Sequence, residues 1–186
     1  TGQTAGHAVM ALRLSNYDDA VVLKWGMSGW GPTWSAKWEN NIGTLNHDNW
    51  TTSVSLSTAI PYDPASISST NTTGENILAE RVESMLTDGF KAIDNTEVLD
   101  NYQNYFINNF WDEADVTQYG HIVDAFRIKP MTLTNEELYN LDPDQTIVTY
   151  CWTGQTSSMI TAYLTVLGYD AKSLKFGVNG IIYDAL

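Results

Sequence analysis

The chain has 186 residues, of which 43% are hydrophobic and 17% are charged, and this is enough apolar material for the core of a globular domain. Twenty-two acidic residues against nine basic ones give a net charge of −13, which argues against nucleic acid or an anionic membrane as a partner. A single cysteine, Cys151, excludes an intrachain disulfide and a multi-cysteine metal cluster within these residues, and no apolar run is long enough to span a membrane.

Residues 1–29 repeat residues 153–180 near the end of the chain. A circularly permuted chain would not carry the same ending twice, so the repeat predicts two tandem units. We expect residues 1–50 to be the C-terminal part of a first domain, whose missing part packs against this chain. The repeated segments are Thr1-Gly2-Gln3-Thr4 with Thr153-Gly154-Gln155-Thr156, Tyr17-Asp18 with Tyr169-Asp170, and Leu23-Lys24-Trp25-Gly26 with Leu174-Lys175-Phe176-Gly177.

A tryptophan-rich segment and a linker follow the first copy. Residues 26–50 are dense in tryptophan, glycine and asparagine, which predicts an irregular segment held by aromatic packing. Residues 51–73 are crowded with serine and threonine and show no sustained period, which is typical of a linker between domains. Many tryptophans and few lysines also favour a periplasmic or extracellular location.

Residues 74–186 predict an α/β domain with a small central parallel sheet flanked by helices, because short apolar segments alternate with helical patterns. The first helix is capped by Thr72-x-x-Glu75 and ends at Gly89. The unbroken apolar and β-branched run 147–150 predicts a central strand that is buried on both faces. The other elements expected are strands at 105–107, 125–128 and 173–176, a short helix capped by Thr134-x-x-Glu137, and a longer helix that ends at Gly168.

Cys151 lies between the end of the central strand and the start of this longer helix. Unpaired N–H groups of the loop and of the first helical turn are expected to face the sulfur and to favour negative charge there. A reactive thiolate and a bound anion would both be stabilised in this place. The alternative interpretation is an inert core cysteine, because free cysteine is among the most buried residue types.

The motif Cys151-x-x-Gly154-x-x-Ser157 resembles the active-site loop of the rhodanese (sulfurtransferase) family. The resemblance extends from about Glu75 to Tyr183, with the motifs in the family's order. It implies a tandem-rhodanese type with a truncated first domain, in which a rhodanese-like domain over 74–186 carries the active-site loop. The other matching segments are Phe106-Ile107-Asn108, Gly120-His121-Ile122-Val123-Asp124-Ala125, Leu167-Gly168-Tyr169-Asp170 and Leu174-Lys175-Phe176-Gly177-Val178-Asn179-Gly180.

The resemblance implies a sulfurtransferase in which Cys151 is the nucleophile. Thiosulfate, a persulfide or a polysulfide would give its sulfane sulfur to Cys151, and the resulting persulfide would pass it to cyanide or a thiol. No metal or organic cofactor is implied. The implied substrate-binding residues, which offer N–H and hydroxyl groups, are Trp152, Thr153, Gly154, Gln155, Thr156 and Ser157.

This loop departs from the commonest one of the family, which carries basic residues where Trp152 and Thr156 stand here. Arg127, Lys129 and Lys175, from neighbouring strand ends, are the candidates for supplying positive charge instead. Each of them also fits a solvated or structural role.

Three alternatives to the sulfurtransferase follow from the same residues. A catalytically inactive rhodanese-like module would use the loop to bind an anion or a protein partner. A phosphatase would need Cys-x5-Arg, and Ser157 occupies that place. A Cys/His protease would need a histidine beside the thiol, but His121 is expected to be structural and Asp112 to cap a turn.

Overall fold

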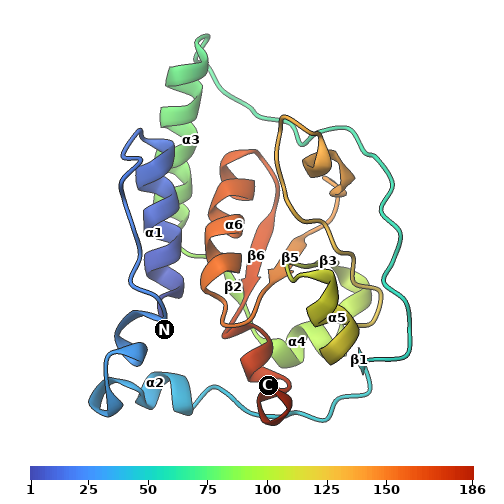
Figure 1. The fold of residues 1–186 in the computed structure, drawn as a ribbon. Coiled ribbons are helices and arrows are strands. Elements are labelled where there is room, and N and C mark those ends of the chain that lie inside the picture. The colour runs from blue at the N-terminus through green and yellow to red at the C-terminus, as the bar shows by residue number, and fades with distance from the viewer.

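A four-stranded parallel sheet lies at the centre of the computed structural model, which describes residues 1–186 (Figure 1). The strands follow the order β2, β6, β5 and β3 across the sheet, and every neighbouring pair is parallel. This architecture, with helices against the sheet, confirms the predicted α/β class. The strands are β2 (Ala92–Ile93), β3 (Phe106–Asn109), β5 (Ile147–Tyr150) and β6 (Ala171–Leu174).

Six α-helices and a small second sheet complete the regular structure. The second sheet is an antiparallel pair of β1 (Trp50–Thr51) and β4 (His121–Ile122). No helix of the protein is both long enough and apolar enough to cross a membrane. The helices are α1 (Gln3–Leu14), α2 (Ala36–Glu39), α3 (Gly74–Asp88), α4 (Asn95–Asp100), α5 (Glu113–Tyr119) and α6 (Gln155–Val166).

Strand β5 is buried on both faces because its side chains alternate between two apolar clusters. Ile147 packs on one face with Phe106 of β3 and Leu164 of α6. Val148 and Tyr150 point to the other face, where they pack with residues of α4 and α5. A strand with an apolar layer on each side has no polar face, which explains the unbroken run in the sequence.

The predicted helix before β2 is present as α3, with its cap displaced by one residue. Thr73 is the capping residue, and its hydroxyl accepts the N–H of Asn76 at 3.4 Å. The helix ends where the sequence predicted, because Gly89 adopts a left-handed φ of 74°. Its apolar face packs against α6 through Val82 and Met85.

Residues 125–128 do not form the predicted strand. Only Phe126 bridges to β3, and Asp124 before it has a φ of 60°, which is incompatible with an extended strand. The buried side chain of Asn108 takes the place of a strand partner, because it accepts the N–H of Ile128 at 2.8 Å and donates to its carbonyl at 3.3 Å.

Two further elements differ from the prediction. The last strand, expected at 173–176, ends at Leu174 because Phe176 has a left-handed φ of 58°. The short helix before β5 is a single 3₁₀ turn, Glu137–Asn140, and Glu137 binds the hydroxyl of Thr132 two residues before the predicted cap.

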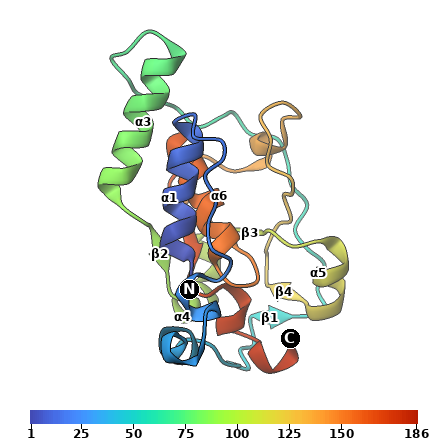
Figure 2. The same cartoon turned by 60° about the vertical axis from the view of Figure 1, so that its left-hand side comes forward.

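The two copies of the repeated sequence lie side by side, since α1 packs along α6 (Figure 1 and Figure 2). Each copy contacts the other through an equivalent glutamine. Gln3 Oε1 accepts the N–H of Phe176 at 3.0 Å, and Gln155 Oε1 accepts the N–H of Trp25 at 3.0 Å. The glycine before each helix is left-handed, with φ of 77° and 81°. The two copies therefore share a left-handed glycine before the helix and make reciprocal glutamine contacts.

Apolar side chains of the N-terminal copy are exposed where their equivalents are buried. Tyr17 is 64% exposed, whereas Tyr169 is 3% exposed. Met27 is 47% exposed, whereas Val178 is fully buried. The first copy therefore has an apolar face that nothing in this structure covers.

The tryptophans around residues 26–50 do not form one aromatic cluster. Trp38 and Trp50 pack against aromatic rings of the second unit, with ring centroids 6.0 and 6.3 Å apart. Trp30 and Trp34 are exposed. The predicted aromatic packing thus applies to only part of the segment.

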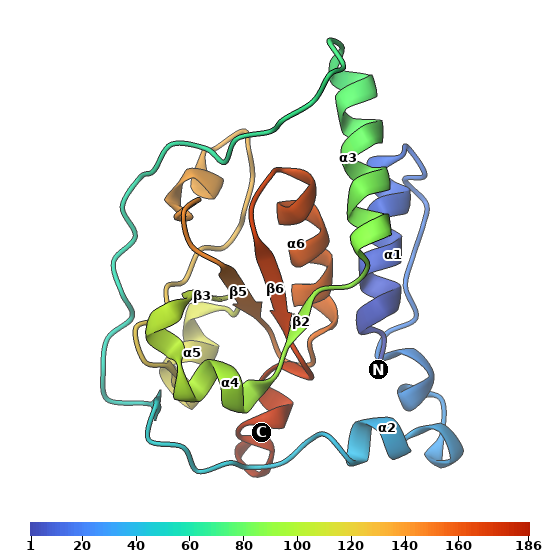
Figure 3. The same cartoon turned by 180° about the vertical axis from the view of Figure 1, so that it is seen from behind.

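The predicted linker contains no helix, and its only strand residue is Thr51. It runs along the outside of the domain from β1 to α3 (Figure 3). Backbone hydrogen bonds hold it in place: Ser57 donates to Ala125 at 2.9 Å, and Tyr62 donates to Tyr139 at 2.7 Å. The division of the chain at 50 and 73 stays a prediction.

His7 should make the fold sensitive to mild acid. It is buried in α1 with neither ring nitrogen hydrogen-bonded, and burial lowers its pKa below the usual value of 6.5. Below about pH 6.5 the unfolded chain binds a proton that the folded chain does not, so the free energy of unfolding falls as the pH decreases through that region toward the lower folded pKa. We expect His7→Met, which copies the equivalent residue Met159, to weaken this fall.

The measurement is urea unfolding of both proteins between pH 8 and pH 5. Carboxylates contribute equally to the pH dependence of both, so the difference between the two curves reports His7. Parallel curves over the whole range would contradict the prediction.

Candidate active site

Cys151 follows β5 directly and lies at the start of the turn that leads into α6. Its Sγ accepts the backbone N–H of Ser157 at 3.3 Å, and the Ser157 hydroxyl oxygen is 3.6 Å from the sulfur. Ser157 belongs to the first turn of α6, where N–H groups have no acceptor within the helix. One helix N-terminal amide therefore points at the sulfur, where the sequence led us to expect several N–H groups of the loop and of the first helical turn.

The turn is fixed through its carbonyl groups. The Cys151 carbonyl accepts the N–H of Val178 at 3.0 Å, and the Trp152 carbonyl accepts the backbone N–H of Asn179 at 3.2 Å and its side-chain amide. The N–H groups of Trp152, Thr153 and Gly154 donate no hydrogen bond. The turn is therefore rigid and still offers free donors to a ligand.

At two glycines in and beside this turn, other parts of the protein come so close that a side chain would collide with them. Gly154 has a φ of 81°, and a Cβ there would lie 2.4 Å from Oε1 of Gln3. Gly177 has a φ of 55°, and a Cβ there would lie 2.2 Å from the carbonyl oxygen of Cys151. No side chain fits at Gly177 without displacing the backbone that holds the cysteine.

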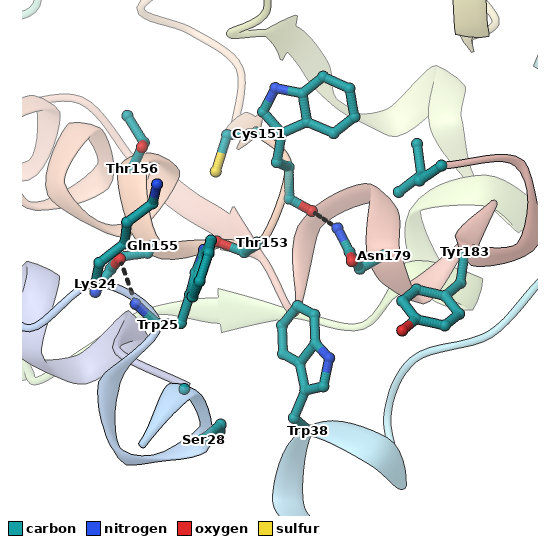
Figure 4. Close-up of a pocket in the computed structure, with 13 residues that line it drawn as sticks. Lys24, Trp25, Ser28, Trp38, Cys151, Thr153, Gln155, Thr156, Asn179 and Tyr183 are labelled. Atoms are coloured by element: carbon teal, nitrogen blue, oxygen red, sulfur yellow. Dashed lines mark hydrogen bonds between the residues drawn. The ribbon is translucent and has the colours of Figure 1, made fainter. Parts of the chain in front are cut away.

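A cavity of about 710 Å³ opens above the sulfur (Figure 4). It is bounded by the turn on one side and by the N-terminal copy on the other. Cys151 is only 4% exposed, so a reagent reaches the sulfur through this cavity. The lining residues are Lys24, Trp25, Ser28, Gly29, Trp38, Cys151, Trp152, Thr153, Gln155, Thr156, Asn179, Tyr183 and Leu186.

The predicted loop residues have different roles in this arrangement. Thr153 and Thr156 face the cavity with their side chains uncommitted. The Gln155 amide binds the N-terminal copy, because it also donates to the Leu23 carbonyl at 2.9 Å. Trp152 stacks on a core tryptophan, with ring centroids 4.4 Å apart. Ser157 is fully buried; its hydroxyl lies 2.8 Å from the Ser173 hydroxyl, and its oxygen accepts a hydrogen bond from Cys151 Sγ at 3.6 Å.

The basic residues suggested from the sequence lie outside the cavity. Arg127 donates to the carbonyl of Trp111 at 2.9 Å, and Lys175 pairs with Asp94 at 2.7 Å. Lys129 pairs with Asp112 at 2.8 Å. Their positive charges are therefore used in structural contacts.

Lys24 is the cation that does line the cavity, and sequence reasoning missed it. The signal was available in the repeat, which makes Lys24 the equivalent of Lys175. The sequence did not predict that the N-terminal copy packs against the turn that carries Cys151. The other lining residues that were missed are Trp25, Ser28, Gly29 and Trp38 from the N-terminal segment and Asn179, Tyr183 and Leu186 from the C-terminal end.

His121 and Asp112 have structural roles. The two ring nitrogens of His121 each lie 2.8 Å from a backbone carbonyl oxygen, of Ile122 and of Val54, and the ring is buried. Asp112 makes no capping bond from its side chain and instead binds Lys129, which lowers the pKa of the carboxyl. Nowhere in the chain do three or more His, Cys, Asp or Glu side chains gather in a way that could hold a metal ion.

Comparison with known proteins identifies one family. Residues 79–183 match the family model described as rhodanese-like domain. None of the curated proteins matches the chain.

Solved structures with similar folds include three bacterial or archaeal proteins. A rhodanese-related protein from Thermoplasma volcanium is 18% identical with a TM-score of 0.42, and the match covers 48% of this chain and 87% of that one. A protein from Lactobacillus plantarum is 29% identical with a TM-score of 0.37, over 55% and 87% of the two chains. A protein of unknown function and possible tyrosine phosphatase from Rhodopseudomonas palustris is 14% identical with a TM-score of 0.40, over 59% and 91%. Because these TM-scores are low, the family assignment rests on the family model.

Replacing Gly177 by alanine should destabilise the fold through the turn that holds Cys151. The new Cβ would meet backbone atoms on the Cys151 side and force a left-handed φ on alanine. We expect Gly177→Ala to lower the free energy of unfolding by roughly 1–3 kcal/mol. Denaturant unfolding measures the change.

Gly74→Ala is the matched control, because nothing lies within 4 Å of a Cβ there. This variant should be as stable as the wild type or slightly more stable, since Gly74 is helical. Equal stability of Gly177→Ala and Gly74→Ala would refute the proposed constraint.

Proposed function

This chain belongs to the rhodanese-like domain family, and from this premise we propose that it is a sulfurtransferase that carries sulfane sulfur as a persulfide on Cys151. The observation that carries the proposal is the position of the sulfur. It lies at the base of a cavity, accepts a helix N-terminal N–H at 3.3 Å, and is followed by three amides without partners.

The first half-reaction loads the cysteine. The Cys151 thiolate attacks the outer sulfur of the donor, so that an Sγ–S bond forms and the bond from that sulfur to the rest of the donor breaks. With thiosulfate the leaving group is sulfite, which departs with the electron pair of the broken bond. The free N–H groups of Trp152 and Thr153, two residues that line the cavity, would stabilise the negative charge on the persulfide and the leaving group.

The second half-reaction would regenerate the Cys151 thiolate. Cyanide or a thiolate attacks the outer sulfur of the persulfide, the Sγ–S bond breaks, and its electron pair stays on Cys151 as the thiolate. The product is thiocyanate or a new persulfide. Atoms and charge balance in both halves without an external oxidant or reductant.

A phosphatase mechanism has less support. It would need an arginine at the place of Ser157 to bind the phosphate with two hydrogen bonds. Here that side chain is fully buried and its hydroxyl contacts Ser173. The rival that the site does support is a non-enzymatic module that uses the free amides to bind an anion or a partner.

We also propose that residues 1–50 are the C-terminal part of a first rhodanese-like unit. The reciprocal glutamine contacts and the exposed face around Tyr17 and Met27 support this proposal, because the rest of such a unit would cover that face. A chain that also carries the front half of the unit should bind the hydrophobic dye ANS more weakly than the 186-residue chain. Equal dye binding would argue against it.

Persulfide formation on Cys151 tests the sulfurtransferase. After incubation with thiosulfate or inorganic polysulfide, the intact mass should rise by one sulfur atom, and cyanide should remove it with release of thiocyanate. Cys151→Ser should show neither the mass gain nor the thiocyanate, because no other thiol is present.

Absence of the adduct with both donors would rule against the enzyme. Retained binding of thiosulfate by that same protein would then favour the anion-binding module.

A further inference from the structure

Lys24 is the one charged side chain among the 13 residues that line the cavity. The chain has 22 acidic residues, and none of them lines it. Figure 4 shows the Lys24 amine directed toward Thr156 and the sulfur of Cys151. Its Nζ lies 4.6 Å from the centre of the Trp25 ring and forms no ion pair with a carboxylate. The cavity is thus a positive site in an acidic protein.

The backbone on both sides of Lys24 is bound to the active-site turn. Leu23 accepts a hydrogen bond from the Gln155 side chain at 2.9 Å, and Trp25 donates to the same side chain at 3.0 Å. Trp25 also has a left-handed φ of 62°, which fixes the bend after Lys24. One glutamine of the turn therefore sets where Lys24 enters the cavity.

The repeat supplies an internal comparison. Lys175, the equivalent of Lys24, is paired with Asp94 at 2.7 Å. Lys24 has no such carboxylate and faces a cavity instead. A carboxylate carried by a ligand would give Lys24 the partner that its equivalent has within the chain.

The other walls of the cavity fit an organic ligand. Trp25, Trp38 and Tyr183 line it, and its volume of about 710 Å³ is in the range of sites for organic molecules. Thiosulfate would leave most of this space to water and would make no use of aromatic walls. The free N–H groups of the turn are available to stabilise the charge that develops next to the sulfur. Lys24 is therefore available to bind a second anionic group of the ligand.

We infer that Lys24 is a specificity-determining residue of the Cys151 cavity, and that the sulfur donor is an organic persulfide that carries a carboxylate. This inference rests on the proposed sulfurtransferase. The carboxylate pairs with Lys24, the organic body lies against the aromatic walls, and the outer sulfur reaches Sγ. The Sγ–S bond forms, the S–S bond of the donor breaks, and the thiolate of the donor leaves and takes a proton from water.

Binding and turnover are tested with one matched pair of ligands, N-acetylcysteine and its neutral amide. In the Cys151→Ser background, titration of tryptophan fluorescence gives the affinity of each thiol without reaction. We expect the carboxylate form to bind about three- to five-fold more tightly, as for a partly exposed ion pair. Lys24→Gln should abolish this preference, and Lys24→Arg should retain it.

Lys37→Gln is the matched control, because Lys37 lies in the same N-terminal segment, is exposed and does not line the cavity. It removes the same charge and should keep the preference. With Cys151 intact, the persulfides of the two thiols should show the same pattern in KM, while kcat of the control Lys37→Gln stays close to that of the wild type.

The outcomes separate this inference from the proposed function. Equal binding of the two thiols by the wild type, or an unchanged preference in Lys24→Gln, would overturn the role of Lys24 whatever Cys151 does. A preference that depends on Lys24 without any persulfide on Cys151 would support the anion site and overturn the sulfurtransferase. Loss of the preference in Lys37→Gln as well would show an effect of net charge and overturn the assignment to Lys24.

Discussion

The turn after β5 is held by its carbonyl groups, and the chemistry of the site follows from this. The 3₁₀ segment that contains Val178 and Asn179 donates to the carbonyls of Cys151 and Trp152. Because a trans peptide points its N–H away from its carbonyl, the N–H groups of Trp152 and Thr153, two residues that line the cavity, point away from this 3₁₀ segment. An anion placed there meets donors that need no rearrangement, which is the condition for electrostatic stabilisation of developing charge. The left-handed Gly177 is required because a side chain there would strike the same carbonyl.

The N-terminal copy contributes residues to the lining of the cavity. Its helix α1 packs along α6, and the segment after α1 is hydrogen-bonded through Leu23 and Trp25 to the start of α6, close to Cys151. Gln155 connects the two copies and is the first residue of α6, directly after the turn that carries Cys151. A change in the contact between the copies would therefore reach the cavity directly, because one glutamine side chain serves both.

The sequence was informative where a local rule decides the structure. The buried strand β5, the ends of α3 and α6 at Gly89 and Gly168, and the position of Cys151 all follow from burial patterns and glycine conformations. The failures have a tertiary cause. Residues 125–128 have the composition of a strand, but the side chain of Asn108 binds both backbone groups of Ile128 in place of a neighbouring strand.

Lys24 shows that the site, too, depends on a contact between distant parts of the chain that the sequence does not reveal. Its sequence neighbours give no sign of a ligand, and its role depends on a contact across about 130 residues of chain between Trp25 and Gln155. Arg127 and Lys175 were better candidates by sequence alone, because the sequence predicted them at the ends of strands that neighbour the strand before Cys151. Their competing partners, a carbonyl and a carboxylate, become visible only in three dimensions.

The acidic balance of the chain does not decide what the cavity binds. At physiological ionic strength charges are screened over about 8 Å, so the side chains that line the cavity outweigh the more distant carboxylates. Those side chains include one lysine and no acid, and the nearest loop adds free N–H groups. The net charge of −13 instead slows the approach of anions from solution and disfavours polyanionic partners. Because Sγ is almost fully buried, a reagent reaches it through the cavity, where Lys24 is the one charged side chain in the lining.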